Sequence, residues 1–125
     1  ESRMDTKIKI LIADDETETC ELLQMYLETK GYEVSTANSG KDAIASVKEN
    51  TPNVMLLDKR IPDMDGLEIL RAIRQFNKTL KIIMVTGADL DPETKPAITE
   101  LCVSDYLYKP IAMSELNNAL VKVLA

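Results

Sequence analysis

The stretch "NVMLLDKRIPDMDG", residues 53–66, carries an apolar run directly into a carboxylate. The four apolar residues from Val54 to Leu57 are typical of a strand that helices cover on both faces of a parallel sheet. Asp58 follows at once, and a proline turn comes after it. A lone Asp is most often a helix cap or a turn residue. An Asp at the end of a buried strand instead indicates a site at the edge of a sheet, so other strand ends should supply its neighbours.

Outside this stretch, short β-rich runs alternate with segments of helical spacing. The β-rich runs are 8–13, 32–37, 54–58, 81–87 and 105–109, and the helical segments are 16–30, 39–50, 66–76, 90–103 and 114–124. This alternation predicts an α/β protein with a parallel sheet covered on both faces. The first, third and fourth runs are the most apolar and belong in the centre. The predicted fold is therefore a flavodoxin-like three-layer sandwich, (βα)5, with strand order 2-1-3-4-5.

Local signals predict where some helices begin and end. Ser39 and Ser114 are expected to cap the second and fifth helices. Asp91 is expected to lie at the start of the fourth helix, and Gly31 to end the first. Pro96 falls within the fourth segment, where a proline removes a helical hydrogen bond and clashes with the preceding turn. We therefore expect a short or distorted fourth helix.

Composition excludes several classes of function. A net charge of −6 makes this domain a poor binder of nucleic acid. The chain has no histidine, which removes histidine-based acid–base catalysis, Ser-His triads and ordinary zinc sites. No apolar run approaches the ~20 residues that span a membrane, and no secretory signal is visible. Cys20 and Cys102 lack metal spacing and are expected to be two small buried hydrophobes, which favours the cytoplasm. Residues 1–6 are interpreted as an N-terminal extension left by cloning, ahead of one domain at 7–125.

Charged and polar residues follow several predicted strands at the same edge of the sheet. They are Asp14 and Asp15 at the end of the first strand, Asp58 at the end of the third, Thr86 at the end of the fourth and Lys109 at the end of the fifth. Two like charges about 4 Å apart repel by roughly 4 kcal/mol at an effective dielectric constant of ~20. Three carboxylates therefore need a proton or a cation, and Mg²⁺ suits oxygen ligands of this kind. Asp63 and Asp65 are interpreted as ordinary turn residues.

Four motifs in order, "ILIADDE", "MLLDKRIPDMDG", "IIMVTGAD" and "DYLYKP", give the chain a family resemblance. Over residues 7–124 it resembles the receiver domain of bacterial two-component response regulators, which has a chemotaxis-type (CheY-like) fold. The resemblance implies a phosphoacceptor signalling switch with self-catalysed phosphotransfer and autodephosphorylation, and not an enzyme. It also implies a sensor histidine kinase or histidine phosphotransfer protein as phosphodonor, and an effector protein or fused output domain as target.

The resemblance assigns a role to each motif residue. Asp58 would accept the phosphoryl group. Asp15, Asp58 and the backbone carbonyl of Arg60 would bind Mg²⁺ directly, and Asp14 would bind it mostly through a water molecule. We further hypothesise that the Arg60 side chain lies over the cleft and pairs with Glu16 or with the phosphate. An alternative of equal weight is a solvated arginine of which only the backbone matters.

The remaining roles concern the switch. Thr86 would hydrogen-bond the aspartyl phosphate, and Lys109 would pair with one of its oxygens. Tyr106 would turn inward when Thr86 moves. Pro110 would follow a cis peptide bond, and Gly66 would allow the tight turn after the third strand. The output face would comprise the fourth helix, fifth strand and fifth helix, which are also a possible homodimer surface.

Three rival interpretations stay open. A haloacid-dehalogenase-type phosphatase would place its nucleophile after the first strand, with a second Asp two residues later, whereas this chain has adjacent aspartates there. A flavodoxin would need a phosphate loop where four acidic residues would repel phosphate. A degenerate receiver would act only as a phosphorylation-independent binding module. The sequence also leaves open whether this is a stand-alone receiver or part of a longer regulator.

Overall fold

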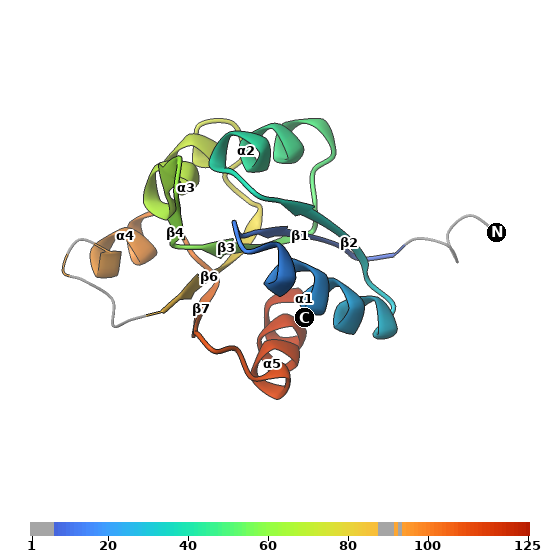
Figure 1. Cartoon of the computed structure of the whole chain (residues 1–125). Coiled ribbons are helices and arrows are strands. Elements are labelled where there is room, and N and C mark those ends of the chain that lie inside the picture. The colour runs from blue at the N-terminus through green and yellow to red at the C-terminus, as the bar shows by residue number, and fades with distance from the viewer. Residues whose placement is uncertain (1–6, 88–91, 93) are drawn as a thin grey trace.

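A parallel five-stranded sheet lies between two layers of helices in the computed structural model of the chain (Figure 1). The structure describes residues 7–87, 92 and 94–125. The sheet has the strand order β2-β1-β3-β6-β7. Its strands are β1 (Lys9–Ala13), β2 (Glu33–Ala37), β3 (Val54–Asp58), β6 (Lys81–Thr86) and β7 (Asp105–Tyr108). Because β6 and β7 are the fourth and fifth long strands, this is the predicted order 2-1-3-4-5, and the flavodoxin-like (βα)5 fold is confirmed.

The helices cover both faces of the sheet. They are α1 (Thr17–Thr29), α2 (Gly40–Glu49), α3 (Gly66–Arg74), α4 (Thr94–Glu100) and α5 (Met113–Leu124). Figure 1 shows α1 and α5 on one face and α2 and α3 on the other, with α4 near the β7 end. One further feature was not predicted. A short antiparallel ladder of β4 (Arg60–Ile61) and β5 (Met64–Asp65) follows β3.

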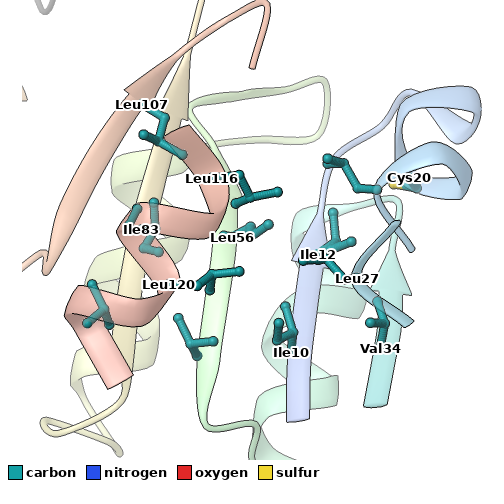
Figure 2. Packing of buried hydrophobic residues seen from close by; sticks show 14 residues of the cluster. Ile10, Ile12, Cys20, Leu27, Val34, Leu56, Ile83, Leu107, Leu116 and Leu120 are labelled. Atoms are coloured by element: carbon teal, nitrogen blue, oxygen red, sulfur yellow. The ribbon is translucent and has the colours of Figure 1, made fainter. Parts of the chain in front are cut away.

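Alternate side chains of the central strands enter two separate cores. Ile10, Ile12 and Leu56 point toward α1 and α5, as Figure 2 shows. The intervening residues, such as Leu11 and Met55, belong to the core beneath α2 and α3. Because both faces are buried, these strands read as continuous apolar runs, which is why the sequence revealed them clearly.

The predicted helix signals have mixed outcomes. Ser39 caps α2 as predicted, accepting a hydrogen bond from the backbone N–H of Asp42. The prediction for Ser114 is wrong, because α5 begins at Met113 after Ala112, which makes no side-chain cap. The fourth helix is short, as expected, but Pro96 is only its third residue. A proline is tolerated in the first turn, where the N–H groups have no helical partner. Asp91 lies outside the described residues.

The two cysteines have different environments. Cys20 is buried in the core between α1 and the sheet, as predicted. Cys102 is exposed and has a φ of 57°, so the prediction that it is a buried hydrophobe is wrong. Both are free thiols. Among the residues described, no helix has the length and apolarity needed to cross a membrane.

Candidate functional site

Three carboxylates meet where β1 and β3 end. Ala13 is in register with Leu57, so the residues after them emerge side by side at the carboxyl edge of the sheet. Asp14, Asp15 and Asp58 each offer an oxygen, and these oxygens lie within 4.8 Å of one another. Asp14 and Asp58 are only 3% and 6% exposed, whereas Asp15 is open to solvent. The predicted convergence of Asp14, Asp15 and Asp58 is therefore present in the structure.

Lys109 reaches this cluster from the end of β7. Its Nζ lies 2.9 Å from Asp58 Oδ2 and 3.2 Å from Asp14 Oδ2. Burial alone would lower the pKa of Lys109, but the hydrogen bond and charge of Asp58, with the charge of Asp14, outweigh burial and raise the pKa above its ordinary value. The ammonium group therefore stays charged at neutral pH.

A further carboxylate, which the sequence did not reveal as part of this network, also contacts the lysine. Glu16 Oε1 lies 3.3 Å from Lys109 Nζ. The hypothesis that Glu16 pairs with Arg60 is therefore not supported, because Glu16 is directed to Lys109. The only signal was the acidic run "ADDE", in which Glu16 was indistinguishable from a solvated residue.

The surroundings of the buried Asp14 carboxylate disfavour its ionised form and raise its pKa. Burial is the largest cause of its raised pKa, and the negative charge of Asp58 adds to the effect. A hydrogen bond from the backbone N–H of Glu16 to Asp14 Oδ1, 2.9 Å long, opposes the shift, as does Lys109. Together, the backbone hydrogen bond and Lys109 do not fully offset the effect of burial and of the Asp58 charge on the pKa of Asp14.

The turn after β3 places the backbone of Arg60 beside the cluster. The N–H of Arg60 donates to Asp58 Oδ1 over 3.0 Å, and its side chain is exposed. Gly66 closes the turn by donating its N–H to the carbonyl of Lys59 over 2.8 Å. A Cβ at position 66 would lie 2.7 Å from Lys59 Cα, so the close approach requires glycine. This confirms the tight turn predicted at Gly66.

Thr86 and Tyr106, the two residues expected to form the switch, differ in their burial and in their position relative to the carboxylate cluster. Thr86 is buried at the end of β6, one residue beyond Val85, the register partner of Asp58. Tyr106 lies on β7 with 40% of its surface exposed, and its ring meets that of Tyr108 edge-on at 5.8 Å. The structure therefore places Thr86 at the site edge and Tyr106 on the outside. The peptide bond before Pro110 is cis, as expected.

The donor set fits a hard divalent cation. The ligand atoms that the structure brings together are all oxygens, one from each of the three carboxylates Asp14, Asp15 and Asp58. Mg²⁺ takes one or two carboxylates and keeps several waters, which leaves positions for phosphate oxygens. Such an ion would also favour the ionised form of Asp14, which burial and, to a smaller extent, the charge of Asp58 disfavour.

Comparison with known proteins agrees with this geometry. The family described as the response regulator receiver domain matches residues 10–121. The chain belongs to this family. Receiver domains are signalling switches of two-component systems, and acceptance of a phosphoryl group and use of Mg²⁺ are general in the family.

Individual relatives resemble this receiver domain over nearly its whole length. Transcriptional regulatory protein ZraR of Salmonella typhimurium is 38% identical over 119 residues, which are 95% of this chain and 27% of that protein. The alkaline phosphatase synthesis transcriptional regulatory protein PhoP of Bacillus subtilis is 35% identical over 116 residues, 93% of this chain and 48% of that protein. The chain thus spans about a quarter of one relative and about half of the other.

Solved structures share the fold. Chemotaxis protein CheY4 of Vibrio cholerae superposes with a TM-score of 0.86 at 28% identity, over 94% of this chain and 99% of that one. A CheY-like receiver domain protein from Methanospirillum hungatei gives a TM-score of 0.88 at 29% identity, over 94% and 93% of the two chains. The expected chemotaxis-type fold of the receiver domain is thereby confirmed.

Proposed function

We propose that the chain accepts a phosphoryl group on Asp58 in a Mg²⁺-dependent reaction and relays that event to an output face. The observation that carries the proposal is the position of the Asp58 carboxylate. It lies among two further aspartates and within 2.9 Å of a lysine whose pKa is raised. A carboxylate held between a cation site and an ammonium group is suited to attack an anionic phosphoryl group.

Asp15, Asp58 and the carbonyl of Arg60 would hold the ion directly, and Asp14 mostly through water. Magnesium, when bound, would screen the negative charge of the transferred group. In the transfer, Asp58 Oδ forms a bond to phosphorus as the P–N bond of a phosphohistidine breaks, and the imidazole keeps the electron pair. Lys109 stabilises the oxygens of the transferred group, since it stays charged at neutral pH.

The output in this proposal is a change at the face formed by α4, β7 and α5. Thr86 would donate its hydroxyl hydrogen bond to the new phosphate. The backbone N–H of Lys109 donates to the carbonyl of Thr86 over 2.7 Å. This bond joins the ends of β6 and β7, so it supports the idea that a movement of Thr86 also moves β7. Tyr106, on β7, would then turn inward. The same face is the surface that we propose for a homodimer.

The proposed partners are a sensor histidine kinase or histidine phosphotransfer protein on one side, and an effector protein or fused output domain on the other. An apolar groove of about 440 Å³ adjoins the cleft and shares Glu16 and Lys109 with it. Since a donor's phosphohistidine must reach Asp58, this groove supports approach of the donor from the side of α1. We place this exchange in the cytoplasm, and we propose no direct contact of this domain with nucleic acid or membrane.

The test is to incubate the protein with Mg²⁺ and acetyl phosphate and to locate the added mass by peptide mass spectrometry. One phosphoryl group is expected on Asp58, as an acyl phosphate that is labile to acid and to base. Chelation of the metal and Asp58→Asn should each abolish the labelling, whereas Asp105→Asn, at the other end of β7, should leave it intact. Labelling that persists in Asp58→Asn would refute the proposal.

The degenerate receiver is the second candidate, and the same measurement separates it. Such a module would bind its partner without acquiring mass under any of these conditions. The contact between Lys109 and Asp58 argues against this candidate. A buried carboxylate cluster lowers the stability of the fold, and a module that only binds a partner does not require one.

A further inference from the structure

We propose that Asn38 and Asp63 are positioning residues that tie together the two loops expected to carry the magnesium ligands. The bridge between those loops is the turn from β2 to α2, residues 38–41. At one end this turn holds the loop of Asp14 and Asp15, and at its other end it holds the β4–β5 hairpin that begins with Arg60. The inference rests on the magnesium site proposed above.

The contact with the first loop comes from Asn38. Its side-chain Nδ2 donates to the backbone carbonyl of Asp14 over 3.0 Å. The backbone of the same loop is also tied to β2, because the N–H of Asp14 donates to the carbonyl of Ala37 over 3.1 Å. The position of the two adjacent aspartates therefore depends on the turn that Asn38 begins.

The contact with the second loop is made by Asp63. Its Oδ1 accepts from the N–H of Gly40 over 2.8 Å, and its Oδ2 accepts from the N–H of Lys41 over 3.2 Å. The hydrogen bond from Gly40 is the largest cause of the lowered pKa of Asp63. The carboxylate is therefore ionised at neutral pH and caps the first turn of a helix to which it is distant in sequence.

The turn that makes both contacts is itself held firmly. Ser39 accepts from the N–H of Asp42 over 3.1 Å and so fixes the start of α2. Gly40 packs directly on Met64 of β5, where a Cβ at position 40 would lie 2.8 Å from Met64 Cβ. The hairpin is thus held against α2 by packing as well as by the bonds to Asp63.

Movement of Asp63 should reach the ligand carbonyl through the hairpin. Ile61 is paired with Met64, and Arg60 with Asp65, in the short β4–β5 ladder. Asp63 lies in the turn between the two strands and is their polar link to α2. The turn at 38–41 therefore sets how far the Arg60 carbonyl lies from Asp14 and Asp15, which a small cation that demands near-octahedral geometry would sense.

The test is a double-mutant cycle on magnesium affinity, measured by isothermal titration calorimetry with MgCl₂ alone. Asn38→Ala and Asp63→Ala should each raise the Kd by about 3- to 10-fold, at or below the lower end of the usual effect of an outer-shell ligand. Because both act through one turn, the double variant should be less impaired than the product of the single effects. Asp63→Asn, which keeps an acceptor oxygen, should recover part of the loss.

The matched control is Asp42→Ala, which removes one negative charge from the same helical turn without touching the hairpin. Asp42 is exposed, and its backbone, not its side chain, bonds to Ser39. In metal-free protein, Asp63→Ala should also speed hydrogen exchange of the Gly40 and Lys41 amides, which the control should not.

Three results would overturn the inference. The first is a Kd in Asn38→Ala and Asp63→Ala equal to that in Asp42→Ala. The second is strict multiplicativity of the two effects. The third is failure of the wild-type protein to bind Mg²⁺, which would refute the proposed magnesium site as well and is seen in the wild-type titration alone.

Discussion

At the scale of single residues, the cleft carries more negative charge than its lysine can neutralise. Lys109 is shared among Asp58, Asp14 and Glu16, while Asp15 adds a fourth carboxylate nearby. The raised pKa of Asp14, caused first by burial and then by the charge of Asp58, shows that its ionised form is disfavoured in the folded state. The metal-free cleft should therefore reduce the stability of the domain, as functional sites often do.

We predict that Asp14→Asn stabilises the metal-free domain by about 0.5–2 kcal/mol, the usual range for a substitution that relieves such a site. The amide has no charge to desolvate and can still accept the hydrogen bond from Glu16 N–H. Urea unfolding in the presence of a chelator measures the effect. The wild-type protein at the same pH is the reference.

The pH dependence gives the prediction a definite sign. Because the folded pKa of Asp14 lies above its ordinary value of 3.8, the folded state binds this proton more tightly than the unfolded chain does. The penalty is therefore absent below about pH 3.8, and it develops as the pH rises from there through the folded pKa. The stability gain of Asp14→Asn should grow over the same range. A gain that is constant with pH, or a loss, would contradict this account.

At the scale of elements, α4 depends on a side chain from another helix. Arg74, the last residue of α3, is buried. Its Nε donates to the carbonyl of Leu101 over 2.9 Å and its second terminal nitrogen donates to that of Cys102 over 3.2 Å. These carbonyls follow α4, where backbone acceptors have no helical partner. Arg74 thus fixes the end of α4 that enters β7, on the proposed output face.

We predict that Arg74→Met lowers the free energy of unfolding by about 1–3 kcal/mol, because the carbonyls of Leu101 and Cys102 lose the charged donor that the buried Arg74 side chain supplies, while much of its apolar volume is kept. The matched control is Arg71→Met on the same helix. Arg71 is exposed and makes a 3.8 Å ion pair with Glu100, so its loss should cost under ~1 kcal/mol. Denaturant unfolding of both variants decides the matter, and equal losses would refute the specific role of Arg74.

The same elements show what the sequence could and could not predict. Central strands such as β3 were predictable because burial on both faces leaves a continuous apolar run. The β4–β5 ladder was not, since strands of two residues carry no periodic pattern. Cys102 looked like a core residue by type, but its left-handed backbone is imposed by the turn from α4 to β7. Ser114 looked like a cap, yet α5 begins one residue earlier.

At the scale of the whole molecule, the topology explains why the residues of the cleft could be predicted from the sequence, whereas the residues that position its loops could not. Parallel strands send Asp14, Asp58 and Lys109 to one edge, so strand ends alone predict their meeting. Contacts between loops that are distant in sequence have no comparable sequence pattern by which they could be predicted. Asp63 was interpreted as a turn residue, which it also is, and its bonds to the start of α2 depend on the folded arrangement.

The link between cleft and output face can be tested at Tyr106, which is 40% exposed in the structure and lies edge-on to Tyr108. We predict that beryllofluoride with Mg²⁺, a stable analogue of the phosphoryl group, turns Tyr106 inward. Fluorine NMR of fluorotyrosine-labelled protein, with Tyr106 assigned by Tyr106→Phe, should show a shifted signal with a smaller solvent isotope effect. Tyr26, which lies on α1 and not on an element of this face, supplies an internal reference.

Thr86→Ala separates coupling from binding. Asp58 and Lys109 remain in this variant, so it should still bind beryllofluoride, yet the Tyr106 signal should keep its unliganded position because the hydroxyl that follows the phosphate is gone. Thr86 is buried at the end of β6, directly opposite Tyr108 in the β6–β7 register, so its displacement acts on the strand that carries Tyr106. If Tyr106 shifted equally in Thr86→Ala, the signal would have to travel by another path, through the Lys109 ammonium group and the turn that follows β7.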